Sequence, residues 1–413
     1  MKIGIIIFRF NVKGGTQRVV LSFIKELIRL GHEVRLYTFL YDKENSFQDF
    51  PAGVKVVALS EAHRGWEKDH PRVLGIFTKP NYLREWLNWR RAARELAFLI
   101  DRDTEILNPH GSVSYFAAYY FKKNVKNIPS VWMIHTMASK LWTFWQKNQA
   151  DPSYTVSFLK RLFHWILEKV EIKTFIKAQD QIVVLDFKDQ EYVRHYYGRA
   201  AAIVRNGIDI NLFSFKEKGP LGGRKPIAIL LGGIFFIHRR FEDAFQAAKI
   251  LVDRGFDLNL NLVGDYHNNF NYYEKLVTLS RELSLENKIK FWGVVSDEEF
   301  MRLRHASDIA IFPYHLQSWG LAVFEAMACG TPVIVSKTLG ASEVLMDGEN
   351  ALLVNPKAPE EIAAACERLI NDPGLYIKLS KNGREFVEKN ITWERYAEEM
   401  LKVFKKSLKE KRN

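Results

Sequence analysis

Cysteine is almost absent from this sequence, and Cys329 and Cys366 are the only two thiols in 413 residues. Two thiols exclude a disulfide scaffold and a four-thiolate zinc site, and the histidines show no metal-ligand spacing. So little cysteine is typical of proteins from a reducing compartment. We therefore expect a cytoplasmic protein without a metal site.

Long hydrophobic runs are lacking as well. No uninterrupted apolar stretch approaches the roughly 18–20 residues that cross a bilayer as a helix, and residues 227–237 form the longest obvious one. The apolar run at 3–8 is short for the core of a signal peptide and has no small-residue cleavage site. It is therefore interpreted as a buried first strand.

Acidic residues are too few to balance the basic ones. Lys and Arg total 60 against 48 Asp and Glu, which gives a formal net charge of +12. This excess favours an anionic partner, which could be a nucleic acid, a membrane surface or a phosphorylated metabolite. The composition does not choose among these three. The length predicts two or three domains with substantial cores.

Strand and helix signals alternate in two series along the chain. The first runs from a strand at 2–8 through the turn-prone residues 11–15 and a helix ending at Gly31 to a strand at 34–39. The second begins near residue 226 and contains strands at 227–231, 258–263, 289–291, 309–312 and 332–335. Because such series form parallel sheets, we expect an α/β protein of two facing, doubly wound domains with a cleft between them.

The segment 122–177 interrupts this alternation. Ten Lys and Arg residues accompany three acidic ones, and aromatic residues such as Trp132, Trp142 and Trp165 lie among them. Rings together with cations suit the interface of a membrane that contains anionic lipid. The alternative is that most of these rings belong to a hydrophobic core and the lysines keep the surface hydrated. Both interpretations stay open at this point.

The stretch 317–333 carries most of the chemical information. It follows a predicted strand, so it lies at the carboxyl edge of a sheet, where α/β proteins bind their ligands. Gly320 opens a helix whose first N–H groups can bind an anion such as a diphosphate. Glu325 follows in the next turn, where its carboxylate can bind a pair of sugar hydroxyls.

This stretch resembles the pattern of the family-4 retaining glycosyltransferases (glycosyl transferases group 1), which have the GT-B fold. In that pattern two Glu residues, separated by seven others, lead into Ala-Met-Ala-x-Gly-Thr-Pro-Val. Glu325 is the second Glu here, and Gln317 replaces the first. Further landmarks follow in the family's order over nearly the whole chain, at 14–15, 31–34, 206–209, 264–265, 291–294 and 306–313.

The resemblance implies two Rossmann-like domains and a reaction. Residues 1–207 would form an acceptor-binding domain, with a C-terminal helix at about 392–413 packing back on it, and 208–391 would bind the nucleotide sugar. The implied reaction moves a hexose from a UDP- or GDP-sugar to a hydroxyl of a lipid-linked or glycan acceptor, with retention at the anomeric carbon. It needs neither a metal nor a cofactor. A lipid-linked acceptor would bring segment 122–177 to the inner face of the membrane.

The family neutralises the donor diphosphate with an Arg and, five residues later, a Lys. Arg239 occupies the Lys position here, and Ile234 replaces the Arg. Arg240 and His238 are candidates to provide the missing positive charge.

Two histidines at predicted strand ends also match family positions. His135 corresponds to a residue that contacts the donor sugar, and His110 to one near the acceptor. The resemblance therefore implies His135, Arg239, Gln317 and Glu325 as catalytic residues and His110 as acceptor-binding. The implied donor-binding residues are Gly14, Gly15, Arg240, Gly293, Val294, Ser318, Trp319, Gly320, Leu321 and Glu325.

Other function classes remain as alternatives. A basic nucleic-acid-binding protein is disfavoured because neither zinc-ligand spacing nor an RNA-recognition aromatic motif is present, so we expect no nucleic-acid partner. A GT-B epimerase or phosphorylase would keep the fold and change the reaction. The replacements at Ile234 and Gln317 leave a different donor or an inactive relative as further alternatives.

Overall fold

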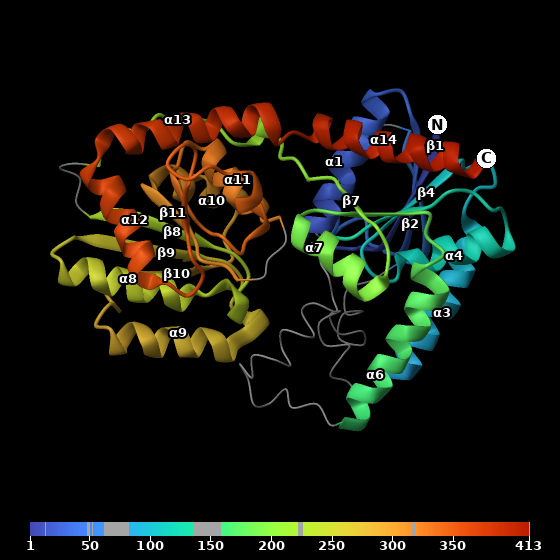
Figure 1. The fold of residues 1–413 in the computed structure, drawn as a ribbon, viewed down its shortest axis with the longest axis horizontal. Coiled ribbons are helices and arrows are strands. Elements are labelled where there is room, and N and C mark those ends of the chain that lie inside the picture. Colours follow the sequence, from blue (N-terminus) through green and yellow to red (C-terminus); the bar gives the residue numbers. More distant parts are fainter. Residues whose placement is uncertain are drawn as a thin grey trace. The chain divides into compact units, whose positions relative to one another are not determined.

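Two parallel β-sheets, one for each of two units, organise the computed structural model of the chain (Figure 1). The structure describes residues 1–12, 14–47, 50–51, 53–61, 82–135, 158–221, 226–315 and 319–412. Unit 1 comprises Met1–Val204 and Tyr396–Asn413, and unit 2 comprises Arg205–Arg395. The expectation of two doubly wound α/β domains is confirmed. The expected domain boundary at residue 207 stays a prediction, and the division between the two units falls between Val204 and Arg205.

The sheet of unit 1 has the strand order β3-β2-β1-β4-β5-β6-β7, and every adjacent pair is parallel. Its strands are β1 (Lys2–Phe10), β2 (Glu33–Tyr41), β3 (Lys55–Glu61), β4 (Ile106–His110), β5 (Val131–Met133), β6 (Gln181–Val184) and β7 (Ala202–Ile203). The chain moves outward from β1 to β3 and then returns to place β4 beside β1 on the other side. The strand order therefore reverses between β1 and β4, which is where doubly wound sheets bind ligands.

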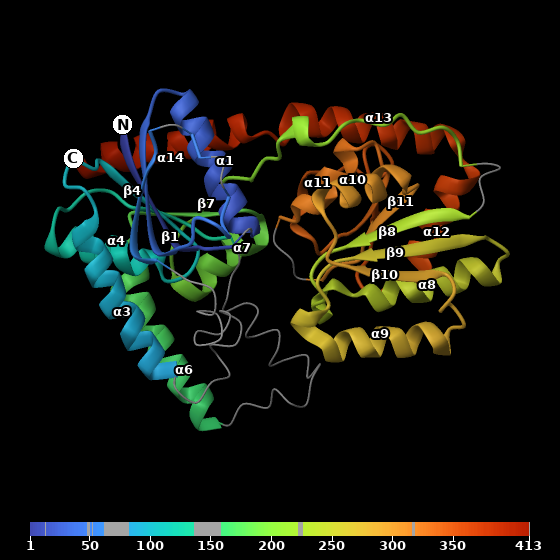
Figure 2. The same ribbon diagram turned by 180° about the vertical axis from the view of Figure 1, so that it is seen from behind.

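Helices cover both faces of this sheet (Figure 2). They are α1 (Gly15–Arg29), α3 (Tyr82–Leu99), α4 (Ser114–Asn124), α6 (Phe158–Glu171), α7 (Phe187–Tyr192) and α14 (Trp393–Arg412), with π-helical turns at Ile172–Ile176 and Val193–Tyr197. On one face, the ring of Phe23 on α1 lies 5.0 Å from that of Tyr396 and 6.2 Å from that of Phe404 on α14. The C-terminal helix therefore completes the core of unit 1.

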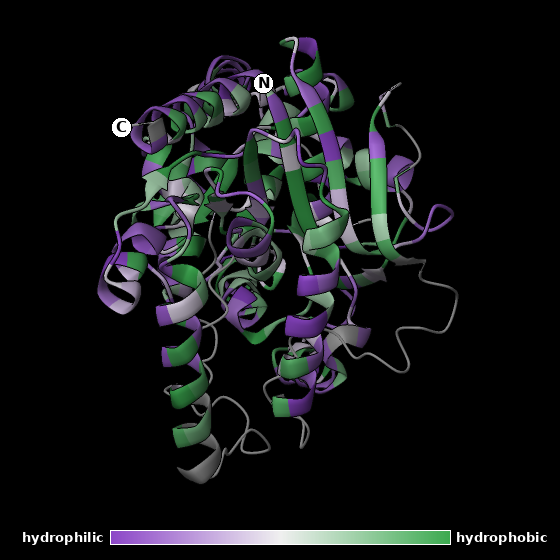
Figure 3. Cartoon of the chain, turned by 90° about the vertical axis from the view of Figure 1, so that its right-hand side faces the viewer, coloured by the Kyte–Doolittle hydropathy of each residue, from purple (hydrophilic) through white to green (hydrophobic). Residues whose placement is uncertain are grey.

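The other face of the sheet carries an aromatic core. Phe116 on α4 packs against Phe175, 4.3 Å away between ring centroids, and against Trp86 on α3. Trp132 on β5 is buried in the same cluster. In the hydropathy colouring of Figure 3, the strands of unit 1 are mostly apolar and the helices alternate between apolar and polar residues. This pattern is expected for a sheet covered on both faces.

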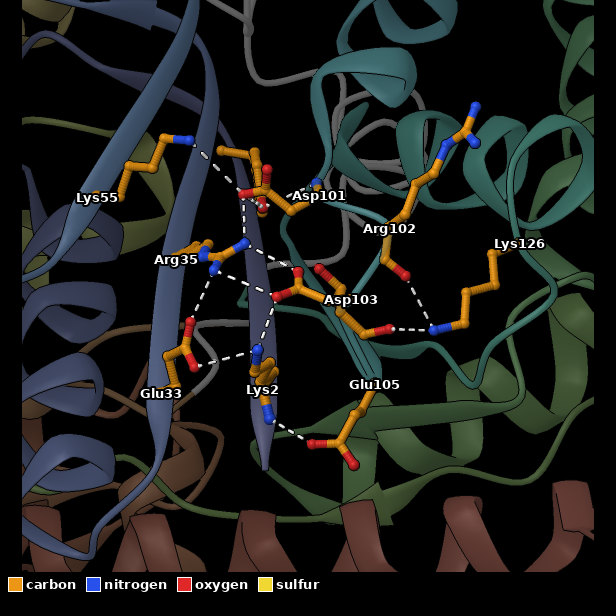
Figure 4. Close-up of polar contacts among 11 residues, drawn as sticks. Lys2, Glu33, Arg35, Lys55, Asp101, Arg102, Asp103, Glu105 and Lys126 are labelled. Atoms are coloured by element: carbon orange, nitrogen blue, oxygen red, sulfur yellow. Dashed lines mark hydrogen bonds and ion pairs between the residues drawn. The ribbon is translucent and has the colours of Figure 1, made fainter.

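Ion pairs connect the strands of unit 1 at their amino ends (Figure 4). Arg35 on β2 lies 2.7 Å from Glu33, 2.6 Å from Asp101 and 2.9 Å from Asp103. Lys2, at the start of β1, lies 2.7 Å from Asp103. Pairs as exposed as these contribute only fractions of a kcal/mol each. They lie at the edge of the sheet opposite to the carboxyl ends of its strands.

The sheet of unit 2 has the order β10-β9-β8-β11-β12-β13 and is again parallel throughout. Its strands are β8 (Ile227–Gly232), β9 (Leu258–Val263), β10 (Ile289–Gly293), β11 (Ile309–Phe312), β12 (Val333–Ser336) and β13 (Leu352–Val354). Here the strand order reverses between β8 and β11, and this reversal fixes where the loops after those two strands meet.

The α-helices of unit 2 are α8 (Phe241–Asp253), α9 (Phe270–Glu282), α10 (Asp297–Ala306), α11 (Leu321–Ala328), α12 (Pro359–Asn371) and α13 (Pro373–Asn390). Short 3-10 turns lie at Ile210–Leu212, Ile237–Arg239, His267–Asn269 and Gly340–Val344. No helix among the described residues is long and apolar enough to span a bilayer.

Candidate active site

In unit 2, the loops after β8 and β11 meet where the strand order reverses. Tyr314, two residues beyond β11, is buried, and its hydroxyl donates a hydrogen bond to the carbonyl of Gly232 at the end of β8. The backbone carbonyl of Tyr314 accepts a hydrogen bond of 3.1 Å from the Thr338 hydroxyl. The phenol ring is thereby fixed as the floor of this edge of the sheet.

Arg239 lies on that floor. It ends the 3-10 turn Ile237–Arg239, and its guanidinium carbon is 4.4 Å from the centroid of the Tyr314 ring. Its Nε is buried and has no hydrogen-bond partner among the described residues. Burial lowers the pKa of Arg239, but an arginine remains a cation at neutral pH. A buried cation with an unused donor is suited to bind an anionic ligand.

The neighbours of Arg239 do not offer a second free cation. Arg240 lies 2.9 Å from Glu242 and 3.0 Å from Asp243 at the start of α8, so its charge is balanced within the protein. Burial and the adjacent Arg239 lower the pKa of His238 to about 3, which leaves its imidazole neutral. Ile234, at the family's Arg position, is 41% exposed.

Three glycines bring the carboxyl ends of β8, β9 and β10 close together. Gly264 has a φ of +153°, and a Cβ added there would lie 1.9 Å from the carbonyl oxygen of Gly233. The N–H of Gly264 donates to the carbonyl of Gly293 over 2.9 Å. Gly293 lies at a register shift in β10, and the next residue, Val294, is 74% exposed. The site therefore has a backbone wall with one projecting apolar side chain.

The N-terminus of α11 follows β11, the strand that lies beside β8 in the sheet. Trp319 is buried, and its indole N–H donates a hydrogen bond of 2.8 Å to the carbonyl of Asn206. Gly320 is left-handed, with a φ of +77°, and a Cβ there would lie 2.9 Å from Leu339. Leu321 is the first helical residue, and the first N–H groups of a helix have no acceptor within it. The predicted residues Gln317 and Ser318 lie outside the described residues.

Glu325 forms an ion pair that its sequence does not suggest. Its Oε2 contacts the guanidinium of Arg304 on α10, and both side chains are largely buried. The Arg304 guanidinium also lies 3.9 Å from the ring centroid of Phe300. The pair fixes the orientation of the Glu325 carboxylate. Removing that carboxylate leaves a buried cation alone, at a cost of about 3–5 kcal/mol.

In unit 1, the corresponding strand ends carry the predicted glycine loop and both predicted histidines. Gly14 is the N-cap of α1 and Gly15 its first residue. The Gln17 side chain donates a hydrogen bond of 2.9 Å to the carbonyl of Arg9 and so closes the turn after β1. His110 ends β4, which pairs directly with β1.

His110 and His135 contact each other. Nδ1 of His110 lies 3.0 Å from Nε2 of His135, and Nε2 of His110 lies 2.7 Å from the side-chain oxygen of Asn108. His110 is only 1% exposed, and both of its ring nitrogens are engaged. The geometry therefore points away from a direct acceptor contact by His110. Burial lowers the pKa of His135 to about 4, so its ring is neutral at pH 7.

Sequence reasoning missed three residues of this arrangement: Asn108, Arg304 and Tyr314. Tyr314 follows Pro313, a position that the family resemblance already marked, so it could have been found. Arg304 and Asn108 become visible only when the contacts between elements are known.

Two family models match almost the whole chain. The model described as "Glycosyltransferase Family 4" matches residues 13–212, and the one described as "Glycosyl transferases group 1" matches 214–386. An uncharacterised glycosyltransferase of Methanocaldococcus jannaschii is 24% identical over 98% of both chains. The mannosylfructose-phosphate synthase of Agrobacterium fabrum is 21% identical over 94% of this chain and 85% of its own.

Solved structures with the same fold include the sucrose-phosphate synthase of Thermosynechococcus elongatus, with a TM-score of 0.71 and 19% identity over 98% of both chains. Another is HepE of Anabaena in complex with UDP-glucose, with a TM-score of 0.68 and 16% identity over 98% of this chain and 100% of that one. Fold and site thus define a GT-B enzyme. The chain belongs to the family-4 glycosyltransferases and is a glycosyltransferase.

We predict that Gly264→Ala destabilises the protein by more than about 3 kcal/mol, because the new methyl group would overlap the Gly233 carbonyl and the backbone would have to move. Gly255→Ala is the matched control. Gly255 also has a positive φ, of +87°, but nothing lies within 4 Å of its added Cβ, so only the conformational cost of about 1 kcal/mol applies. Urea unfolding followed by circular dichroism measures both, and equal losses would contradict the predicted contact.

Proposed function

We propose that this glycosyltransferase uses a nucleotide-diphosphate sugar and transfers its hexose to a hydroxyl acceptor, with retention and without a metal. The observation that carries the proposal is Arg239, a buried cation with an unused N–H that lies over Tyr314 where the strand order of unit 2 reverses. The relatives support a hexosyl donor, since one is named for mannosylfructose phosphate. The complex of HepE with UDP-glucose supports a uridine nucleotide.

The proposed roles in unit 2 follow from the charge that develops during the reaction. The bond between the anomeric carbon and the phosphate oxygen breaks, and negative charge collects on the diphosphate. Arg239 and the N–H groups at Gly320 and Leu321 stabilise that charge. Glu325 binds the ribose hydroxyls, and the wall at Gly293 and Val294 adjoins the base.

The proposed roles in unit 1 concern the sugar and the phosphate. His135 binds a sugar hydroxyl, and the N–H groups at Gly14 and Gly15 bind a phosphate oxygen. The acceptor oxygen forms its bond to the anomeric carbon on the face from which the diphosphate departs. Its proton moves to the departing phosphate oxygen. The products are the glycosylated acceptor and the nucleoside diphosphate, and no enzyme nucleophile is required.

We also propose a lipid-linked acceptor, on the basis of α6. Among the side chains that the structure describes on this helix, five large apolar ones are exposed: Leu162, Phe163, Trp165, Ile166 and Val170. Lys169 is exposed on the same helix, with its Nζ 5.8 Å from the ring centroid of Trp165. Exposed apolar rings with adjacent cations match the depth profile of a membrane interface with anionic lipid.

We expect Arg239→Ala to lower kcat/KM about 100-fold or more, because one preorganised donor to the leaving group is lost. Arg239→Lys retains the charge and should recover part of the activity. The control is Arg254→Ala, which removes an arginine paired with Glu367 on the surface of the same unit. Release of nucleoside diphosphate in the presence of acceptor measures turnover.

The same variants can be melted with UDP-, GDP- and ADP-sugars. A donor that binds the folded protein raises its Tm, and we expect this rise in the wild type and in Arg254→Ala but not in Arg239→Ala. Near-normal turnover of Arg239→Ala at saturating donor, with an unchanged rise in Tm, would remove Arg239 from the proposal.

We expect Glu325→Gln to raise the KM for the donor about tenfold through a weakened hydrogen bond to the ribose, while its amide oxygen still accepts from Arg304. Glu325→Ala would confuse this effect with unfolding, because Arg304 would lose its partner. Glu343→Gln is the control, since Glu343 pairs with Arg205 in the same unit at 3.0 Å.

Donor analogues that lack a ribose hydroxyl complete the Glu325 test as a double-mutant cycle. The wild type should lose affinity for them, and Glu325→Gln should lose little more. Fully additive losses would show that Glu325 does not contact the ribose.

We expect the wild type to bind vesicles that contain phosphatidylglycerol at low salt. The double variant Trp165→Ser/Ile166→Ser should bind these vesicles at least about tenfold more weakly, because two interfacial apolar side chains are lost. Leu212→Ser/Met346→Ser is the control, with two equally exposed apolar residues in unit 2. Vesicle flotation measures both. A wild type that ignores these vesicles refutes the membrane proposal and leaves the enzyme assignment in place.

A further inference from the structure

We propose that Asn108 and His110 act as positioning residues that fix His135 in a single tautomer, with the proton on Nε2 and a lone pair on Nδ1. In this arrangement His135 offers a substrate only a hydrogen-bond acceptor. It is therefore suited to bind a sugar hydroxyl and unsuited to bind a phosphate. The choice of a sugar hydroxyl rests on the proposed function, whereas the tautomer rests on the contacts in unit 1 alone.

A backbone carbonyl fixes the orientation of the Asn108 amide. The side-chain nitrogen of Asn108 lies 2.6 Å from the carbonyl oxygen of Val131 on the neighbouring strand β5. A carbonyl can only accept, so the NH₂ group of the amide must face it, and the opposite orientation would place two acceptors in contact. The oxygen of Asn108 is thereby directed to Nε2 of His110, 2.7 Å away. Since that oxygen can only accept, Nε2 of His110 carries a proton.

His110 has only this one ring proton. The residue is buried beside the ring of Phe23, 6.2 Å away between centroids. Burial and the neighbouring His135 hold the pKa of His110 well below its usual value, so the ring is neutral. A neutral imidazole with its proton on Nε2 has a lone pair on Nδ1. Nε2 of His135, 3.0 Å from that lone pair, must therefore donate.

The state of the other ring nitrogen of His135, Nδ1, follows from the same reasoning. Its ring is also neutral, so a proton on Nε2 leaves Nδ1 as an acceptor. The backbone around the pair is fixed by strand register. The N–H of Gly111 donates to the carbonyl of Met133 over 2.8 Å, and the hydroxyl of Ser114 donates to the carbonyl of His110 over 2.8 Å. The acceptor is therefore prepared before a substrate arrives, which lowers the cost of binding it.

Arg239 and His135 therefore suit different parts of the donor, the diphosphate and a sugar hydroxyl. Arg239 can only donate hydrogen bonds and suits the diphosphate. His135, held as an acceptor, suits a hydroxyl and disfavours an anionic oxygen, whose lone pairs would face its own. A neutral His135 that was free to change tautomer could bind either group. The Asn108–His110 pair thus restricts the transferase to a donor or acceptor with a hydroxyl at this point.

Nitrogen NMR of the wild-type protein, labelled at histidine, tests the tautomer without any variant and without activity. Protonated and unprotonated ring nitrogens have well separated shifts. We expect His135 to show a protonated Nε2 and an unprotonated Nδ1, and His110 to show the same pattern. A protonated Nδ1 on His135, or rapid averaging between tautomers, would overturn the proposal.

Variants of His110 then test its role. His110→Phe fills the same space but cannot accept from His135, so the His135 signals should shift toward a tautomer mixture, with kcat lowered about tenfold. His110→Gln offers both an acceptor and a donor and should restore most of both. Unchanged His135 signals and unchanged kcat in a folded His110→Phe would contradict the positioning role.

Deoxy and fluoro analogues of the donor identify the hydroxyl. One analogue should lose about tenfold in kcat/KM with the wild type and little with His135→Phe. Suppose that the NMR tautomer is as expected but no analogue and no acceptor derivative shows this difference between the wild type and His135→Phe. The proposed contact between His135 and a substrate hydroxyl is then wrong, and the role of Asn108 and His110 in fixing the tautomer is retained. If the protein transfers no sugar at all, the proposed function fails, and the NMR result still decides the tautomer.

Discussion

The reversal of strand order beside β1 and β8 is the constraint on which the rest of the structure depends. A parallel sheet directs all its carboxyl ends to one edge, but neighbouring loops diverge only where the order reverses. In unit 1 this edge carries Gly14 and His110, and in unit 2 it carries Arg239 and Tyr314. Each unit therefore brings candidate site residues together from segments far apart in sequence. The ion pairs of Arg35 lie at the amino ends of the strands and so do not occupy the carboxyl edge.

Of the three arginines described for the site in unit 2, two are paired with acidic residues. The guanidinium of Arg239 lies over the Tyr314 ring, that of Arg304 is paired with Glu325, and Arg240 is neutralised by the first turn of α8. The tip of α11 adds partial positive charge through its N–H groups rather than through further side chains. Under the proposed function, such a site attracts the diphosphate and releases it after transfer, because fixed dipoles near solvent hold an anion less tightly than a second unpaired buried cation would.

Most of the fold could be predicted from the sequence, and the reasons are local. Apolar periodicity located α1, β1, β2 and the strands β8 to β12, but not β3, β6, β7 or β13. Gly320 marked the beginning of α11 one residue before its first helical residue, Leu321. The site was predictable only as a set of residue types at strand ends. The aromatic partner of Arg239, the ion pair between Arg304 and Glu325, and the chain from Asn108 to His135 depend on which strands are neighbours and in what register. Periodicity does not encode that information.

The return of α14 to unit 1 has a consequence for biosynthesis. The rings of Phe23 and Phe404 pack together, yet the ribosome makes the whole of unit 2 between them. Unit 2 is contiguous in sequence and can fold as soon as it emerges, whereas α1 keeps an apolar face uncovered until α14 has been made. The N-terminal half of the nascent chain is thus the part with the greater need for chaperone protection, although it is synthesised first.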